Sequence, residues 1–341
     1  MTGSQEPGRK KVLVIRIGRL GDTILATPVI EVLLDHFGDH ISIDFVTSTG
    51  ASARILAMDQ RVNRVFPVSH RNLHWRVHPE KRELGRYSRQ HPYDLVINLE
   101  CGKQCDDFIR FVHHKAFCGR PLVSPAHRAD RHCVDTEKSI YADLLGHEVT
   151  AIAETCLQIS LETTPLPVED DREFVILNPG FSGIKRAGYR SHRGWPVDHW
   201  LRLIGLIREH TSLAIVINGI LEEQPYFLDL LQQDRVFSLF GSDLPALMFA
   251  LTKACALVSV DTGTMHLAAA LGTPVVALFG PGNPRLTGPY GQQVPHRILS
   301  SGVDCQPCVK TPMEKKCTFN RCMNGLQAGD VFVNLQQLMK T

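Results

Sequence analysis

The chain has 341 residues, of which 43% are hydrophobic and 21% are charged, and 37 Lys and Arg against 35 Asp and Glu leave a formal net charge of +2. This composition is typical of a globular protein, and the length is about twice that of one compact domain, so we expect two domains. The nearly balanced charge argues against a protein that covers nucleic acid with its whole surface.

The chain starts with MTGSQEPGRKK, which lacks the apolar stretch of a secretory signal, and no segment reads as a membrane-spanning helix. We therefore expect a cytoplasmic protein. The ten cysteines are then expected to be reduced thiols, because the cytosol keeps them so.

The first half of the chain alternates apolar strands with helical patterns. A strand is predicted at residues 10–18, and apolar residues at helical spacing follow at 23–37. Further strands are predicted at 42–48, 64–69 and 93–100. This alternation predicts a parallel, doubly wound sheet.

The pattern restarts after LETTPLPVEDDRE, residues 161–173, whose two prolines and five acidic residues predict a linker. The strands and helices expected beyond it are 174–180, 198–209, 213–219, 222–233, 236–241, 243–253, 256–263, 274–280 and 328–339. We predict one domain at 1–165, a second at 166–327 and a C-terminal helix at 328–341. Two such halves make a cleft, in which ligands bind at the carboxyl ends of the strands.

The first informative strand end is RIGRLGD. Gly18 and Gly21 permit a tight turn and a close backbone approach, and Asp22 falls where the next helix begins. One interpretation of Asp22 is an N-cap residue, which accepts hydrogen bonds from free helix amides. The other is a general base in the cleft, and the two roles are compatible.

The second strand end is Asp261-Thr262-Gly263-Thr264. The free amides and dipole of a helix N-terminus form a phosphate site, and Asp261 before the turn suits sugar hydroxyls. Together they predict a nucleotide-sugar ligand. His266, on the first helical turn, could face the diphosphate or could be a packed histidine.

The third strand end is followed by Lys185, Arg186, Arg190 and Arg193. One interpretation is that these four side chains belong to a solvated basic loop. The other is that they offset the negative charge that develops on a departing diphosphate.

In NGILEEQ, after the strand at 213–219, Glu222 or Glu223 could accept hydrogen bonds from ribose hydroxyls. The alternative is that these acids only complement the dipole of the following helix.

These segments together resemble glycosyltransferase family 9, the heptosyltransferases of the bacterial lipopolysaccharide inner core. The resemblance runs from about residue 11 to residue 335 and rests on motifs in the family's order: GDTILATP, WP with a basic residue two positions before the Trp, SVDTGTMHLAAALGTPVVALFGP and TGPYG. It implies the two-domain GT-B fold and an inverting transfer that needs no divalent metal.

The resemblance also implies roles for single residues. Asp22 matches the family's proposed base, Asp261 its donor-sugar contact, and the amides of Thr262, Gly263 and Thr264 its phosphate contacts. Family members often have Lys where this chain has Arg193, which leaves open whether Arg193 or Lys185 meets the diphosphate. The usual donor is ADP-L-glycero-D-manno-heptose, which we expect here.

Residues 69–92 hold six Lys and Arg and four His against two Glu, in the half expected to bind the acceptor. This basic surface fits a phosphorylated, lipid-linked sugar at the inner membrane, and a solvated helix face is the alternative. A hexosyltransferase, a protein-O-heptosyltransferase and a non-catalytic nucleotide-sugar or metal-binding protein are the competing functions. No nucleic-acid partner is expected.

Four cysteines, Cys305, Cys308, Cys317 and Cys322, lie within 18 residues, and the first two have the spacing of a metal knuckle. Four thiolates suit Zn or Fe in a closed structural site, and free or redox-active thiols are the alternative. Similar cysteines recur at this place in parts of the family.

Overall fold

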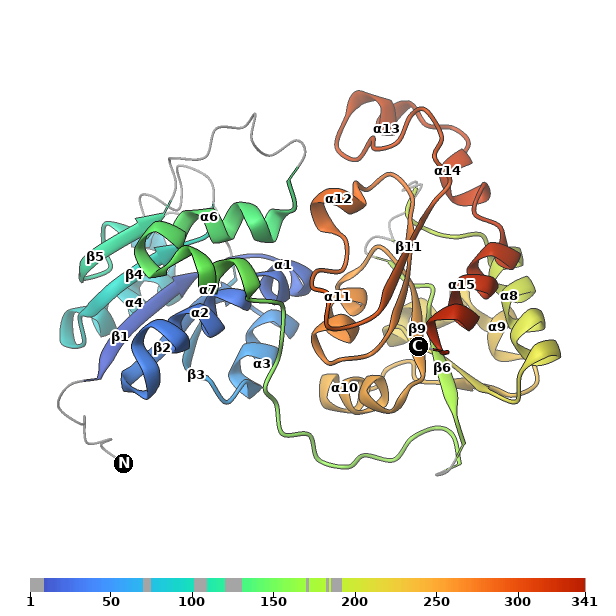
Figure 1. Ribbon diagram of the computed structural model, residues 1–341, viewed down its shortest axis with the longest axis horizontal. Helices are drawn as coiled ribbons and strands as arrows, with labels where there is room; N and C mark the ends of the chain where they lie inside the picture. Colours follow the sequence, from blue (N-terminus) through green and yellow to red (C-terminus); the bar gives the residue numbers. More distant parts are fainter. Residues whose placement is uncertain are drawn as a thin grey trace. The chain divides into compact units, whose positions relative to one another are not determined.

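The computed structural model describes residues 9–69, 75–100, 109–119, 131–169, 172–181, 184 and 192–340 (Figure 1). The chain divides into two compact units, Met1–Ser160 and Leu161–Thr341, and each is considered by itself. Residues 161–169, inside the expected linker, form neither helix nor strand.

Unit 1 is built on five parallel strands in the order β3-β2-β1-β4-β5. The strands are β1 (Lys10–Ile15), β2 (Ile41–Ser48), β3 (Val62–Val68), β4 (Tyr93–Asn98) and β5 (His114–Gly119). The central strand β1 reads as a continuous apolar run because both of its faces are covered, and Val12 to Ile15 are fully buried.

The described helices of unit 1 are α1 (Leu20–Leu25), α2 (Pro28–Phe37), η1 (Gly38–His40), α3 (Ala51–Met58), η2 (Trp75–Val77), α4 (Pro79–Gln90), α6 (Cys133–Leu145) and α7 (His147–Ile152). The helical pattern at 23–37 is two helices, because Pro28 has no amide hydrogen to continue α1 and suits the first position of α2. Helix α2 packs against both α6 and α7 (Figure 1).

Unit 2 is built on six parallel strands in the order β11-β10-β9-β6-β7-β8. They are β6 (Phe174–Asn178), β7 (Ala214–Ile217), β8 (Val236–Ser238), β9 (Ala256–Val260), β10 (Val275–Phe279) and β11 (His296–Ser300). Strand β11 is at the sheet edge and partly exposed, so it lacks the apolar run that marks the central strands.

The helices of unit 2 in the described part of the chain are α8 (Val197–His210), η4 (Leu221–Tyr226), α9 (Leu228–Leu231), α10 (Leu244–Lys253), α11 (Gly263–Ala270), α12 (Pro284–Thr287), α13 (Pro312–Lys316), α14 (Arg321–Asn324) and α15 (Ala328–Leu338). The helix expected at 222–233 is instead the 3-10 helix η4 followed by the short α9. Pro225 lies inside η4 and, having no amide hydrogen, interrupts α-helical hydrogen bonding.

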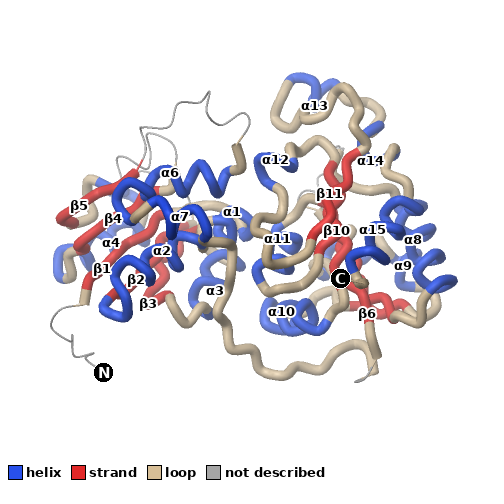
Figure 2. The backbone as a smooth tube through the Cα atoms, viewed as in Figure 1, coloured by secondary structure: helices blue, strands red, loops and turns tan. Residues whose placement is uncertain are grey.

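The core of unit 2 lies where α8 and α15 pack together against the sheet (Figure 2). Helix α8 buries Trp200, Leu203, Ile204 and Ile207, the spacing of one helix face. On β9, Val258 and Val260 join this core, whereas α11 packs with α10 and against β9 and β10. Helices thus cover the sheet as a doubly wound fold requires.

The two sheets share the order of their first five strands, and the sheet of unit 2 has β11 as an additional edge strand. The strand order reverses between β1 and β4 in unit 1 and between β6 and β9 in unit 2. In open parallel sheets, ligands bind beyond the carboxyl ends of the strands at this point of reversal. The residues that follow β1, β4, β6 and β9 are therefore the first candidates for function.

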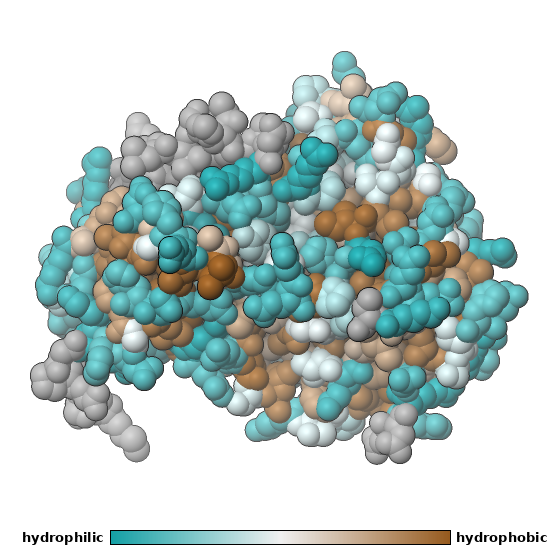
Figure 3. Space-filling model, viewed as in Figure 1, coloured by the Kyte–Doolittle hydropathy of each residue, from teal (hydrophilic) through white to brown (hydrophobic). Residues whose placement is uncertain are grey.

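Hydrophilic side chains cover most of the face shown in Figure 3, and they interrupt its hydrophobic areas. Within the described residues, no helix has the length and apolar character to cross a bilayer.

Candidate active site

In unit 1, the turn between β1 and α1 places Asp22. Helix α1 begins at Leu20, so Asp22 is the third residue of the helix and not its N-cap, which is Arg19. The Asp22 Oδ2 accepts a hydrogen bond from the Arg19 amide at 2.9 Å. Its side chain is 47% exposed, which leaves the carboxylate accessible to a ligand.

The two glycines of this segment do different things. A Cβ at Gly18 would overlap the Asp22 side chain and would lie 2.8 Å from Oδ2, so only glycine allows this close approach. Gly21 lies inside α1 and not in the turn before it, because the helix begins one residue earlier.

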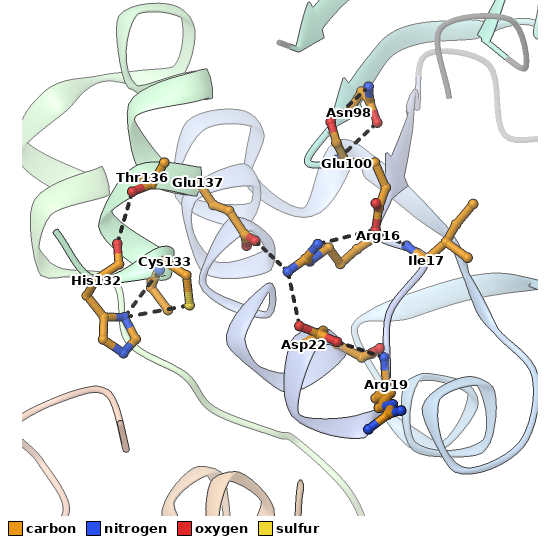
Figure 4. A network of polar contacts seen from close by, with 12 residues as sticks. Arg16, Ile17, Arg19, Asp22, Asn98, Glu100, His132, Cys133, Thr136 and Glu137 are labelled. Atoms are coloured by element: carbon orange, nitrogen blue, oxygen red, sulfur yellow. Dashed lines mark hydrogen bonds and ion pairs between the residues drawn. The ribbon is translucent and has the colours of Figure 1, made fainter. Parts of the chain in front are cut away.

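A cluster of charges centred on Arg16 lies beside Asp22 (Figure 4). Arg16, directly after β1, places Nη2 3.4 Å from Asp22 Oδ1 and 3.1 Å from Glu137 Oε1, and Nη1 3.2 Å from Glu100 Oε1. Glu100 follows β4 and Glu137 lies on α6, and their side chains are 0% and 4% exposed. Burial acts to lower the pKa of Arg16, but the charges of Glu137, Asp22 and Glu100 raise it overall.

In unit 2, neutral polar side chains join the ends of three neighbouring strands. The side-chain Nδ2 of Asn178 donates hydrogen bonds to Ser259 Oγ and Thr262 Oγ1, both at 3.1 Å. Asn218, after β7, donates to Asn178 Oδ1 at 2.7 Å. These bonds hold the start of the Asp-Thr-Gly turn against the strand ends.

The Asp-Thr-Gly turn leads into α11 as the sequence predicts. Thr262 is the extended N-cap residue of α11, which begins at Gly263. The amides of Gly263 and Thr264 lie in the first turn, where a helix has no internal acceptors for its amide hydrogens. This end of α11 can therefore bind an anion. His266 is buried, at 6% exposure.

Arg193 contacts Asp261 directly. Its Nη1 lies 3.3 Å from Asp261 Oδ2 and donates to the Asp261 carbonyl oxygen at 3.2 Å. Burial raises the pKa of the Asp261 carboxyl, and the Arg193 charge opposes that shift. A Cβ at Gly282 would lie 2.7 Å from Asp261 Oδ2, so the carboxylate is packed closely on that side as well.

The structure also distinguishes the two acids of NGILEEQ. Glu222 is exposed, whereas Glu223 is buried and accepts a hydrogen bond from the Ile220 amide at 3.2 Å. A Cβ at Gly180 would overlap the Glu223 carboxylate, so Glu223 lies beside the chain that leaves β6. Lys185, Arg186 and Arg190 lie outside the described residues.

The four cysteines at 305–322 surround one cavity of about 210 Å³, together with His192, Met313, Lys316, Thr318, Phe319 and Arg321. All four are free, and Cys308 and Cys322 are buried. Burial raises the pKa of Cys322 to about 11, and the neighbouring thiols act in the same direction. In the described part of the chain, no three His, Cys, Asp or Glu side chains are arranged to hold a metal ion.

The sequence patterns that identified Asp22 and Asp261 missed the side chains that hold them. Arg16, Glu100 and Asn178 were not singled out, although each stands at or directly after the end of an apolar strand run. That position was the available signal. Glu137 had no such signal, because it lies in the middle of α6.

Comparison with known proteins decides the family. The model of glycosyltransferase family 9 (heptosyltransferase) matches residues 108–318, well over half of the chain. The chain belongs to glycosyltransferase family 9. The match includes the Arg193, Asp261 and Thr262–Thr264 positions of unit 2.

Several relatives of this family 9 enzyme match over more than four fifths of its length. It is 27% identical to lipopolysaccharide heptosyltransferase 1 of Pseudomonas aeruginosa, over 91% of this chain and 88% of the relative.

Solved structures share the fold of this chain. A family 9 glycosyltransferase from Veillonella parvula has a TM-score of 0.78 at 18% identity, covering 99% of both chains. The Escherichia coli heptosyltransferase WaaC, solved with ADP, has a TM-score of 0.70 at 21% identity, covering 96% of this chain and 99% of that one. The GT-B architecture of two Rossmann-like domains is confirmed.

Proposed function

We propose that this family 9 glycosyltransferase transfers heptose from ADP-L-glycero-D-manno-heptose to a hydroxyl of the lipopolysaccharide inner core, with inversion. The observation that carries the proposal is a half-exposed carboxylate, Asp22, held at the strand reversal of unit 1 by Arg16 and Arg19. The related enzyme of P. aeruginosa is a lipopolysaccharide heptosyltransferase, which supports the donor sugar and the acceptor.

In this mechanism Asp22 accepts the proton of the acceptor hydroxyl. The deprotonating oxygen attacks the anomeric carbon from the face opposite the diphosphate, so the carbon–oxygen bond to the diphosphate breaks as the new glycosidic bond forms. A single displacement of this kind inverts the anomeric centre. No protein-bound sugar is needed.

Unit 2 is proposed to bind the donor. The amides of Gly263 and Thr264 at the start of α11 supply hydrogen bonds to phosphate, and Arg193 offsets the charge that develops on the leaving ADP. We propose Asp261, together with Glu222 or Glu223, as the carboxylates that accept hydrogen bonds from sugar hydroxyls. Glu222 is the exposed one of these two acids, whereas Glu223 is buried and accepts a hydrogen bond from the Ile220 amide.

Replacing the base tests the mechanism. Asp22→Asn keeps the shape of the side chain but removes its affinity for a proton, so turnover should fall about 10²- to 10⁴-fold while ADP binding persists. Asp35→Asn, an exposed carboxylate on α2, is the matched control and should retain full turnover. Wild-type turnover in Asp22→Asn would remove Asp22 from the mechanism.

The donor is tested by thermal shift against ADP-, GDP- and UDP-sugars. A specific ligand stabilises the folded state by mass action, by about 2.7 kcal/mol at one hundred times its Kd. ADP-heptose should give the largest rise in Tm. A larger rise with a UDP-hexose would favour a hexosyltransferase instead.

The acceptor is proposed to be a phosphorylated, lipid-linked sugar reached at the membrane surface. Arg82, Arg86 and Arg89 are exposed on α4 at the spacing of one helix face. Each basic residue near an anionic leaflet contributes about 1 kcal/mol to binding. Replacing all three arginines by Gln should abolish sedimentation of the protein with vesicles that contain about 30% anionic lipid. Unchanged sedimentation would contradict the proposal.

The four cysteines are proposed to hold a structural zinc or iron ion. They surround one cavity, and four thiolates are a suitable donor set, although the described arrangement does not bring three of them into a metal-binding group. Binding would therefore require the segment to contract around the ion. Protein purified without added metal should contain one equivalent of zinc or iron. The double variant Cys305→Ser/Cys308→Ser should lose this metal. Metal-free protein with four titratable thiols in this segment would refute it.

A further inference from the structure

Asp22 shares one nitrogen of Arg16 with a second carboxylate. Arg16 Nη2 lies 3.1 Å from Glu137 Oε1 and 3.4 Å from Asp22 Oδ1, so Glu137 is the closer of the two (Figure 4). The other terminal nitrogen, Nη1, faces Glu100. One positive charge is thus divided among three negative charges.

This division has a chemical consequence for a general base. A carboxylate that monopolises a buried guanidinium holds its negative charge very favourably and accepts a proton poorly. A base must be fixed in position and must still bind a proton well. Arg16 alone would provide the first property at the expense of the second.

We infer that Arg16 positions Asp22 for catalysis while Glu137 and Glu100 take up most of its positive charge and so keep Asp22 a competent base. All three are positioning residues, since they act through Asp22. The inference rests on the proposed role of Asp22 as the base.

The architecture supports different parts for the two glutamates. Glu100 Oε1 also accepts the Ile17 amide at 2.7 Å, and its own amide is bonded to Asn98 Oδ1 at 3.1 Å, so Glu100 fixes the turn as well as the charge. Glu137 comes from α6, far along the chain. Glu137 is therefore the residue whose charge can be removed with less effect on the turn.

Two other titratable groups of this corner, Cys133 and His132, add no charge. Cys133, on the first turn of α6, is half-buried, and desolvation followed by the charge of Glu137 raises its pKa to about 12, so it is a neutral thiol. His132 Nδ1 accepts a hydrogen bond from the Val134 amide at 3.2 Å and is thus unprotonated at that nitrogen. Arg19 donates its backbone amide to Asp22, and its guanidinium, which is exposed, is a positive charge screened by solvent.

The test is the pH dependence of kcat/KM. In Glu137→Gln, Arg16 Nη2 should interact with Asp22 alone and make it a weaker base. The acidic limb of the pH profile of kcat/KM should therefore move to lower pH, and the plateau value of kcat/KM should fall about three- to tenfold. In Arg16→Gln, the limb should move the opposite way, to higher pH. Should Arg16→Gln not fold, Arg16→Lys keeps a charge without the fork and should lower the plateau with little movement of the limb.

A matched control separates positioning from stability. Asp59 is a fully buried carboxylate paired with Arg61 at 2.7 Å in the same unit, so Asp59→Asn should lower Tm and leave the acidic limb in place. ADP binding should be unchanged in every variant, because its proposed site is in unit 2. The inference would be overturned if folded Glu137→Gln had the wild-type pH profile of kcat/KM. It would also be overturned if this variant had a lower Tm and a lower plateau but an acidic limb at the wild-type pH.

Asp22→Asn distinguishes this outcome from failure of the proposed function. If Asp22→Asn is active, the base assignment is wrong. If it is inactive while Glu137→Gln and Arg16→Gln leave the limb unmoved, only the role of the charge cluster is wrong.

Discussion

The two units share a strand topology but place different chemistry at the point where the strand order reverses. In unit 1 the strand ends carry the charged side chains of Arg16 and Glu100, and Arg16 in turn contacts Asp22 and Glu137. In unit 2 they carry the neutral chain of Asn218, Asn178, Ser259 and Thr262, which supports backbone amides. The same fold therefore presents a charged cluster beside a carboxylate in one unit and the amides of a helix N-terminus in the other, and the side chains at the strand ends decide which.

The largest expected effect comes from the turn of unit 1. In Gly18→Ala the new Cβ overlaps the Asp22 side chain, so the carboxylate must move and turnover should fall on the order of 100-fold, with ADP binding unchanged. Steady-state kinetics and calorimetric titration with ADP measure the two effects.

Gly205→Ala is the matched control for this change. A Cβ at Gly205, inside α8, meets nothing within 4 Å, so the variant should keep full turnover and gain about 0.5–1 kcal/mol of stability. Equal turnover in Gly18→Ala and Gly205→Ala would mean that Asp22 needs no fixed position.

In unit 2, Asn178→Ala removes the centre of the polar chain. Asn178 is 3% exposed, so Ser259 and Asn218 would lose a buried partner, and the free energy of unfolding should fall by about 1–3 kcal/mol. ADP affinity should fall too, because Thr262 is freed. Denaturant unfolding is the measurement, and Asn334→Ala, whose hydrogen bond to Asp330 is exposed, should change little.

The smallest effect on stability is expected at Asp261. Burial raises the pKa of this carboxyl in the folded state, so its charged form destabilises the fold at neutral pH, and that penalty disappears as the pH falls below the unfolded value. Asp261→Asn should therefore raise Tm at pH 7 and lose the advantage near pH 3, while it weakens donor binding.

Asp229→Asn, an exposed carboxylate on α9, should leave Tm unchanged at both pH values. A lower Tm for Asp261→Asn at pH 7 would show that the Arg193 ion pair outweighs the burial of the carboxylate.

The contrast between the two sites was only partly visible in the sequence. Asp22 and the Asp-Thr-Gly turn could be found because each interrupts an apolar strand directly before a helix, and backbone chemistry at that place is local. The helix at 222–233 could not be placed correctly, because a proline within a helical pattern allows several local solutions and only packing selects one.

By itself, the amino-acid sequence determined the alternation of strands and helices, the existence of two parallel sheets and the strand ends that are candidates for function, since these depend on periodicity and on residues adjacent in the chain. Only the tertiary structure decided which side chains meet there. Arg16 and Glu137 are more than a hundred residues apart, and their contact depends on α6 packing against the sheet. Such long-range neighbours decide whether a carboxylate is tied up in a structural ion pair or can accept a proton, because the energy of a charge depends on the groups that surround it in space.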